Sequence, residues 1–127
     1  MRTSESEVMR VVRMDTSTIG IPLWRNNSGA AQTLSGVVRF GLGNESTAAN
    51  KNIKSADLIG ITKSGKFLSI ECKTNVKKLG AGGLAQIAWM NIIRAHNGIA
   101  VITDGETCLT PEGEVTYNDF LNMLKEA

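Results

Sequence analysis

The chain has 127 residues, of which 42% are hydrophobic and 20% are charged, and its formal net charge is +2. This length and composition predict one globular domain over residues 1–127, and the absence of any run of about 18 apolar residues excludes a membrane-spanning helix from the prediction. Residues 1–7 are polar and lack the apolar core of a signal peptide, and two cysteines, Cys72 and Cys108, make no disulfide framework, so we expect a reducing, intracellular setting.

The net charge hides an asymmetry between the two parts of the chain. Residues 104–127 contain six acidic residues and one basic residue, which leaves a net charge of +7 on residues 1–103. A basic body predicts a polyanionic partner such as nucleic acid. An ordinary solvated surface of mixed charge explains the same count equally well.

Residues 4–15 are predicted to form a helix. Ser4 suits the N-cap, and Glu5 and Glu7 lie in the first turn, where the helix dipole favours acidic side chains. Val8 and Val12, with their neighbours, supply an apolar stripe at helical spacing. The two glutamates are explained by stabilisation of the helix end alone, or by a role in a site.

Two strands are predicted next, at residues 21–27 and 36–42, and the small polar residues 28–34 between them are predicted to form a loop. Residues 44–54 are polar, and we expect them to form a flexible loop. Because this loop leads directly into Asp57, we expect it to contact a substrate.

Residues 57–73 are predicted to form two short strands joined by a tight turn, and they carry the main functional signal. Asp57 begins the first strand, and Glu71, Cys72 and Lys73 end the second. Because side chains on a strand alternate between its faces, Glu71 and Lys73 project together while Cys72 points away. A carboxylate and an ammonium at the end of an apolar strand are costly to bury without partners. A divalent metal near Asp57 and Glu71 would be such a partner.

The length of the turn decides whether the two carboxylates meet. Residues 63–65 suit a three-residue loop in which Gly65 takes the left-handed conformation. This loop places Asp57 opposite Glu71, on one face of the sheet. A two-residue loop would place Asp57 opposite Cys72, on the wrong face.

The second half of the chain is predicted to continue as a basic loop at residues 74–83, followed by a helix at residues 84–97. Residues 99–103 form a continuous apolar run, which predicts a central strand that is buried on both faces and parallel to the preceding one. Turns with a small hairpin are expected at residues 104–114, and a terminal helix at residues 118–126. The whole pattern predicts an α/β fold with a mixed sheet, its first strands in antiparallel succession and helices on its faces.

A carboxylate, a hairpin and then Glu-Cys-Lys at the end of the next strand stand in a fixed order with other pieces of the sequence. These pieces are the acid-bearing first helix, residues 24–27 with Gly29, residues 39–42, residues 55–60, residues 70–73 and Gln86. The ordered set resembles the PD-(D/E)XK nuclease superfamily, and more specifically the virus-type replication-repair nuclease (VRR-NUC) family. Ser55 and Ala56 stand before Asp57 where the superfamily often has Pro or Gly, a position that shapes only the turn.

The resemblance implies a restriction-endonuclease-like fold and a metal-dependent DNA endonuclease that acts on branched DNA, such as Holliday junctions, in replication, recombination or repair. Asp57 and Glu71 would hold Mg²⁺ or Mn²⁺, which prefer oxygen ligands. The backbone carbonyl of Cys72 would complete the metal shell. Glu5 would add a third carboxylate, with Glu7 as the alternative.

Two further side chains take catalytic roles in this comparison. Lys73 would position or activate the attacking water and stabilise charge, and Gln86 would contact the water or the phosphate. The competing hypotheses are a DNA-binding module that has lost catalysis and a subunit of a larger nuclease complex. The expected location is the cytoplasm, which for a phage-encoded enzyme would be that of the host.

DNA contacts are expected on basic and polar side chains that flank the site. The candidates are Arg25, Asn27, Arg39, Lys51, Lys54, Lys77 and Lys78. Paired cuts in a junction require two active centres, so we also expect a twofold homodimer. The candidate contact residues for that dimer are Trp24, Phe40, Leu42 and Trp89. At least two of these four are expected to be buried in the core instead.

Overall fold

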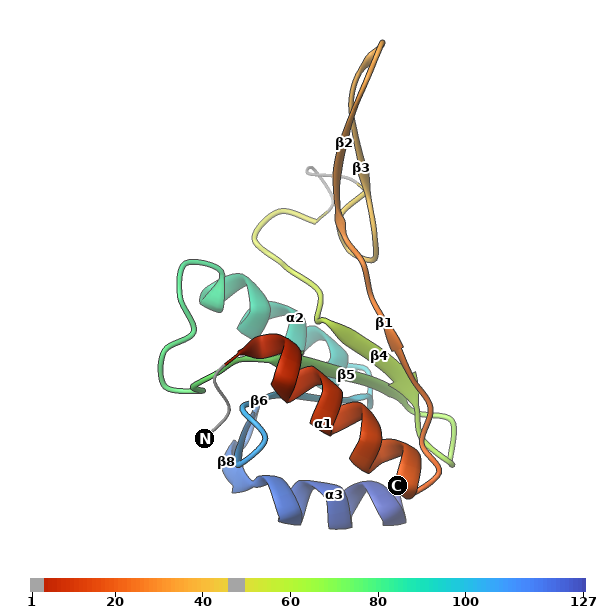
Figure 1. Ribbon diagram of the computed structural model, residues 1–127, viewed down its shortest axis with the longest axis vertical. Coiled ribbons are helices and arrows are strands. Elements are labelled where there is room, and N and C mark those ends of the chain that lie inside the picture. The colour runs from red at the N-terminus through yellow and green to blue at the C-terminus, as the bar shows by residue number, and fades with distance from the viewer. Residues whose placement is uncertain (1–3, 46–49) are drawn as a thin grey trace.

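The computed structural model of the chain describes residues 4–45 and 50–127 (Figure 1). Residues 46–49 of the predicted substrate loop lie outside the described residues. The elements of the described ranges are α1 (Glu5–Thr18), β1 (Leu23–Arg25), β2 (Gly29–Thr33), β3 (Gly36–Phe40), β4 (Leu58–Ile61), β5 (Phe67–Cys72), α2 (Gly83–Ala95), β6 (Ile99–Thr103), β7 (Thr107–Thr110), β8 (Gly113–Thr116) and α3 (Tyr117–Glu126). None of these helices has the length and apolar character that crossing a membrane requires.

A mixed six-stranded sheet forms the centre of the molecule, in the order β1-β4-β5-β6-β7-β8. The pairing of β5 with β6 is parallel, and the other four pairings of the sheet are antiparallel. The parallel pair is joined through α2, as the buried apolar run of β6 predicted. The predicted α/β fold with a mixed sheet flanked by helices is therefore confirmed.

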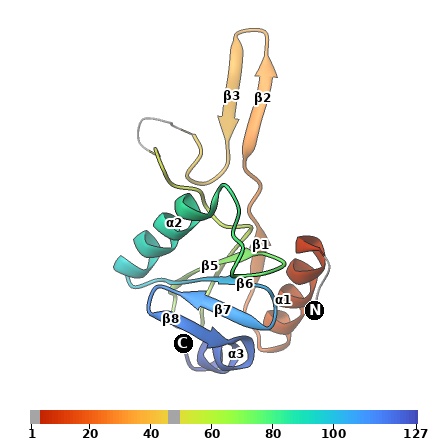
Figure 2. The same ribbon diagram turned by 90° about the vertical axis from the view of Figure 1, so that its left-hand side faces the viewer.

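The helices cover the two faces of the sheet, α1 and α3 on one and α2 on the other (Figure 2). Alternation along β5 separates the two faces: Leu68, Ile70 and Cys72 enter the core beneath α1 and α3. Ser69 and Glu71 instead face α2, where each receives a hydrogen bond from that helix. The strand that carries Glu71 is thus buried on both sides, which fixes the position of this carboxylate.

The helix predictions are confirmed, with small shifts of their ends. Ser4 caps α1 by accepting a hydrogen bond from the Glu7 N–H at 3.1 Å, and α1 continues to Thr18, three residues beyond the predicted end. The predicted hairpin after β6 is present as β7 and β8, which pair antiparallel. The α3 N-cap is Thr116, whose side chain accepts from the Asp119 N–H.

The loop predicted at residues 28–34 is wrong. Residues Gly29–Thr33 form β2, which pairs antiparallel with β3 in a two-stranded ribbon separate from the main sheet. Figure 1 shows this ribbon projecting from the body as an arm. Most residues of both strands are exposed, so no buried face imposed an apolar alternation that the sequence could display. We call residues 29–40 the β-arm.

The predicted antiparallel succession of the first strands also needs correction. β1 is shorter than predicted. It pairs directly with β4, because β2 and β3, which lie between them in the sequence, form the separate β-arm. Of the candidate dimer contacts, Trp89 is buried and donates from Nε1 to the Ser69 Oγ at 2.9 Å. Trp24, Phe40 and Leu42 are 55%, 45% and 36% exposed, so the expectation that core packing would bury at least two of these four residues is wrong.

Gly60 provides a test of this architecture. A Cβ atom at Gly60 would lie 2.3 Å from the backbone oxygen of Pro22, which is closer than real contacts allow. Gly60→Ala is therefore expected to push β1 away from β4 and to lower the free energy of unfolding by about 1–3 kcal/mol. Chemical denaturation followed by circular dichroism measures this change. Gly82→Ala is the control, because its added Cβ meets nothing closer than 3.6 Å, and an equal loss in both variants would contradict the close approach.

Candidate metal centre

The turn between β4 and β5 sets the register of the site. The Thr62 N–H donates to the Lys66 carbonyl at 3.0 Å, the Gly65 N–H donates to the Thr62 carbonyl at 2.9 Å, and Gly65 has a φ of 89°. The three-residue loop at residues 63–65 is therefore confirmed. Pairing of Leu58 with Ile70 follows from it, and one step further along both strands Asp57 stands opposite Glu71.

Two hydrogen bonds hold Asp57 and Glu71 together. In each of them, the carboxylate of one residue accepts from a backbone N–H of the segment that carries the other. The Asp57 N–H donates to Glu71 Oε1 at 3.1 Å, and the Cys72 N–H donates to Asp57 Oδ2 at 3.0 Å. Glu5 joins them from the first turn of α1, so that one carboxylate oxygen of each of the three residues lies within 4.8 Å of the others. We call Glu5, Asp57 and Glu71 the acidic triad.

The two glutamates of the first turn differ in their distance from Asp57 and Glu71. Glu5 is part of the acidic triad, whereas Glu7 is not among its members. The side chain of Cys72 packs in the core beneath α1, as its place on the apolar face predicted. Its backbone carbonyl stays a predicted ligand.

Glu71 is the buried carboxyl group of the acidic triad. Its relative exposure is 6%, and burial, together with the smaller effect of the Asp57 charge, raises its pKa from 4.5 to about 7. Lys73 and the Asp57 N–H act in the opposite direction, as does the charge of Lys54. A buried carboxyl group that faces another carboxylate needs positive charge nearby to stay ionised at neutral pH.

Lys73 and Gln86 both contact the same oxygen of Glu71. The Lys73 Nζ lies 3.6 Å from Glu71 Oε2, and the lysine side chain is only 13% exposed. Gln86 in α2 donates from Nε2 to that oxygen at 2.8 Å. The helix is anchored one turn later by the hydrogen bond from Trp89 to Ser69, which holds Gln86 over the end of β5. The structure therefore brings together all five residues that were predicted to be catalytic.

The acidic triad fits a divalent metal ion on two grounds. Its donors are all carboxylate oxygens, the ligands that Mg²⁺ and Mn²⁺ prefer. In addition, Gln86 Oε1 is buried and has no hydrogen-bond partner within the described ranges. An orphaned buried acceptor is costly, and a water molecule held beside an ion would satisfy it. The three carboxylates are thus able to bind a metal ion.

Asn26 is a supporting residue of the site to which the sequence assigned no role. Its Nδ2 donates to Ser55 Oγ at 2.9 Å and to the Ala56 carbonyl at 2.8 Å, and its N–H donates to the Asp57 carbonyl. It thereby ties β1 to the segment that carries Asp57. The available signal was its place within the matched block of residues 24–27, in which Arg25 and Asn27, but not Asn26, were predicted to contact DNA.

The predicted DNA contacts occupy different surroundings. Arg25 and Asn27 are exposed on and just after β1, and Lys77 and Lys78 are exposed in the loop after β5. The remaining three are Arg39, Lys51 and Lys54. Arg39, near the end of β3, already donates hydrogen bonds from Nε and Nη2 to Asn44. Lys54 lies beside the start of α2, where its N–H donates to the Ala85 carbonyl.

Comparison of the chain with protein-family models, with curated proteins and with solved structures found no match. The class of this protein is therefore defined by its fold and its candidate site alone. This class is an α/β protein with a carboxylate cluster at the end of a central hairpin.

Metal binding tests the acidic triad directly. Titration with Mn²⁺, followed by isothermal calorimetry, is expected to show one site per chain in the wild type. Asp57→Asn and Glu71→Gln each replace a charged ligand with an amide of the same shape, and each is expected to lower the affinity at least about tenfold. Glu112→Gln is the control, since this exposed carboxylate pairs with Arg94 instead. Equal Mn²⁺ affinity in all four proteins would contradict a metal site at the acidic triad.

Proposed function

We propose that this protein is a metal-dependent DNA endonuclease with the PD-(D/E)XK arrangement of the VRR-NUC family. The observation that carries the proposal is the meeting of Glu5, Asp57 and Glu71, with Lys73 on the innermost carboxylate. Support for the fold assignment comes from the order of elements: an acid-bearing helix, a hairpin that joins the two carboxylates, and a helical crossover to a parallel strand.

Hydrolysis of a phosphodiester joins the oxygen of a water molecule to phosphorus and breaks one phosphorus–oxygen ester bond, whose oxygen leaves with a proton. A divalent cation on the acidic triad would supply charge stabilisation at a phosphoryl oxygen and would ease deprotonation of the water. Asp57 and Glu71 would hold this cation, with Glu5 and the carbonyl of Cys72 completing its shell. Their fixed positions mean that little reorganisation is needed when the phosphate arrives.

Lys73 and Gln86 would act on the water and on the developing charge. The Lys73 ammonium is held at 3.6 Å from Glu71 Oε2, so its positive charge would lie close to a phosphate bound by the proposed cation. Gln86 donates a hydrogen bond from Nε2 to Glu71. Its Oε1 has no hydrogen-bond partner among the described residues, so this oxygen could accept a proton of a bound water molecule. Together the two side chains would position the nucleophile on one side of the cation.

Cleavage by the purified chain is the test of this function. A panel of linear, nicked and four-way-junction DNA is expected to be cut in Mg²⁺ or Mn²⁺ and to stay intact in EDTA. Asp57→Asn and Glu71→Gln should abolish cleavage, and Lys73→Ala should lower the rate by about 10²–10³-fold, because it removes a preorganised charge at the transition state.

Lys66→Ala is the control for Lys73→Ala, because Lys66 is exposed in the hairpin turn and takes part in none of the ion pairs found among the described residues. If Lys73→Ala lost metal affinity but kept its rate at saturating metal, the role given to Lys73 would be wrong, since an ammonium is not a ligand. Metal-dependent DNA binding without any cutting would favour the alternative of an inactive DNA-binding module or a subunit of a larger nuclease.

We further propose that the protein acts as a homodimer through the β-arm. Supporting this, the arm carries exposed Leu34, Val37 and Val38, and an isolated two-stranded ribbon is marginally stable in water. Arg39 is the only charged residue of the arm, and edges without charge are templates for pairing with another chain. A second copy would cover these edges and would supply the second centre that paired cuts require.

Sedimentation at micromolar concentration is expected to show a dimer for the wild type and a monomer for Leu34→Ser/Val38→Ser. Met123→Ser is the control, because it removes a similarly exposed apolar side chain from α3. A wild-type monomer that makes paired cuts in a four-way junction would overturn the argument from two centres. A monomer that only nicks would remove the dimer and leave the chemistry intact.

A further inference from the structure

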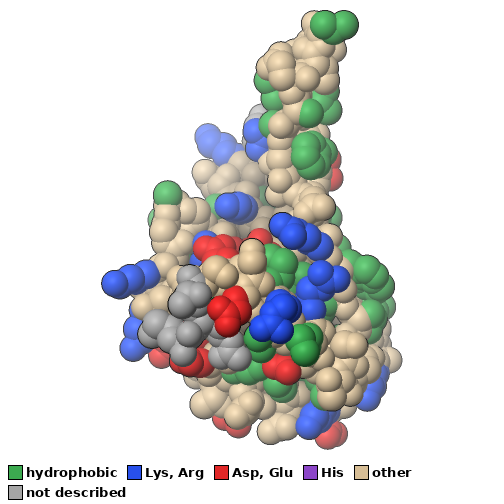
Figure 3. All heavy atoms as spheres, viewed as in Figure 1, with side chains coloured by type: hydrophobic (Ala, Val, Ile, Leu, Met, Phe, Trp, Pro, Cys, Tyr) green, Lys and Arg blue, Asp and Glu red, His purple; other side chains and the backbone are tan. Residues whose placement is uncertain are grey.

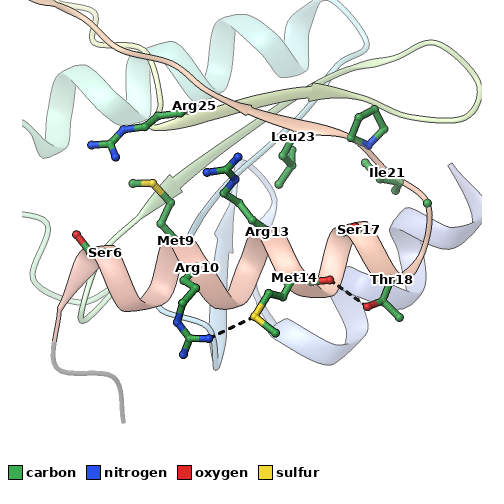
Figure 4. Close-up of a pocket in the computed structure, with 12 residues that line it drawn as sticks. Ser6, Met9, Arg10, Arg13, Met14, Ser17, Thr18, Ile21, Leu23 and Arg25 are labelled. Carbon is green, nitrogen blue, oxygen red and sulfur yellow. Dashed lines mark hydrogen bonds between the residues drawn. The ribbon is translucent and has the colours of Figure 1, made fainter.

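An open groove of about 920 Å³ runs between α1 and β1, outside the acidic triad. One face of α1 forms one wall, and the segment from Gly20 to Arg25 forms the other (Figure 4). The residues that line it are Ser6, Met9, Arg10, Arg13, Met14, Ser17, Thr18, Gly20, Ile21, Pro22, Leu23 and Arg25. The helical residues among them include three adjacent pairs at four-residue intervals, and Figure 4 shows Met9 and Arg13 pointing toward β1 while Arg10 and Met14 lie on the other side of the helix.

The charge of this groove is entirely positive. Its lining contains three arginines, Arg10, Arg13 and Arg25, and no aspartate or glutamate. The ion pairs found within residues 4–45 and 50–127 involve none of the three, and Arg10 only donates to the sulfur of Met14. Figure 3 shows Lys and Arg side chains gathered over this part of the surface beside acidic ones. Three unpaired guanidinium groups in one groove complement a polyanion rather than a neutral ligand.

The groove begins at the acidic triad. Ser6, at one end of its lining, directly follows the triad member Glu5, and Figure 4 shows Arg25 above the same end. Arg25 pairs in register with Leu58, the residue after Asp57. With a helical rise of about 1.5 Å per residue, Arg10 and Arg13 lie roughly 8 and 12 Å from Glu5 along α1. One strand of duplex DNA carries a phosphate per about 3.4 Å of axis, so this distance covers about two to four phosphates.

We infer that the groove between α1 and β1 binds the backbone of the DNA strand that leads away from the scissile phosphate, with Arg10 and Arg13 contacting successive phosphates. This inference rests on the proposed endonuclease function. The apolar side chains of Met9 and Leu23 lie in the same groove and offer a surface for the sugar faces. We call this row of phosphate contacts along the groove the track, and Arg25 connects it to the metal centre. Arg10 and Arg13 carry no sequence-level signal, because exposed arginines on a helix are ordinary surface residues.

The salt dependence of DNA binding tests the track without requiring cleavage. Fluorescence anisotropy with a labelled linear duplex in EDTA, from 50 to 200 mM KCl, gives the slope of log K against log salt. Arg10→Ala/Arg13→Ala is expected to reduce the magnitude of this slope by about 1.8, at about 0.9 for each lost phosphate contact. Both residues are exposed and alanine favours helices, so the fold is expected to persist, as circular dichroism will show.

The control is Arg94→Ala/Lys125→Ala, which removes the same charge from α2 and α3, away from the groove. Equal slopes for the two double variants would overturn the track. Binding to phosphatidylserine vesicles that depends on Arg10 and Arg13, with an unchanged DNA slope, would also overturn it and assign the groove to an anionic surface. A slope that falls as expected in a chain that never cuts DNA would support the track and refute only the proposed function.

Position is tested by crosslinking. Ser17 is exposed in the groove and the native Cys72 and Cys108 are buried, so Ser17→Cys can be labelled selectively with an azidophenacyl group. This label is expected to crosslink to bound duplex DNA, whereas the same label at Asn118→Cys on α3 is expected to leave it free. Equal crosslinking from both positions would contradict a defined track.

Discussion

The register between β4 and β5 is the constraint on which the site depends. A strand slip of one residue would exchange the faces of every side chain on β5 and would turn Glu71 into the core beneath α1. Three features prevent it: the left-handed Gly65 of the turn, the apolar contacts of Leu68 and Ile70, and the reciprocal hydrogen bonds of Asp57. The hairpin therefore encodes the pairing of the two carboxylates in its turn length and in its buried face at the same time.

Burial of Glu71 explains the arrangement of the second helix. A carboxyl group with 6% exposure must receive hydrogen bonds or positive charge, and α2 supplies one of these through Gln86. The bond between Trp89 and Ser69 fixes the helix on the same face of β5, so that the donor is held in place by packing. Lys73 then adds charge from the position directly after β5. The environment of this one side chain thus links the sheet, the helix and the proposed chemistry.

The sequence predicted the parts of the fold in which a buried face leaves an apolar pattern, including the hairpin at residues 57–73 and its turn. It missed β2, because a ribbon that is exposed on both sides has no pattern to read. Asp57 and Glu71 followed from a strand register that has few chemical explanations, whereas the catalytic roles of Glu5, Lys73 and Gln86 were implied by the resemblance to a nuclease family. Asn26 and Arg13 could not be found in this way: one acts through backbone contacts to a distant segment, and the other is distinguished only by the groove around it.

Electrostatics relates the acidic triad to the basic groove beside it. Three carboxyl groups within 4.8 Å of one another repel a phosphodiester, and the charges of Lys73 and Lys54 offset only part of that repulsion. The arginines of the groove attract the same phosphodiester at a distance of a few phosphates from the triad. A strand in the groove would therefore reach the triad favourably only after a divalent cation had neutralised it. In the proposed enzyme, binding of the cation and of the DNA strand are thermodynamically coupled, and each increases the affinity for the other by the same factor.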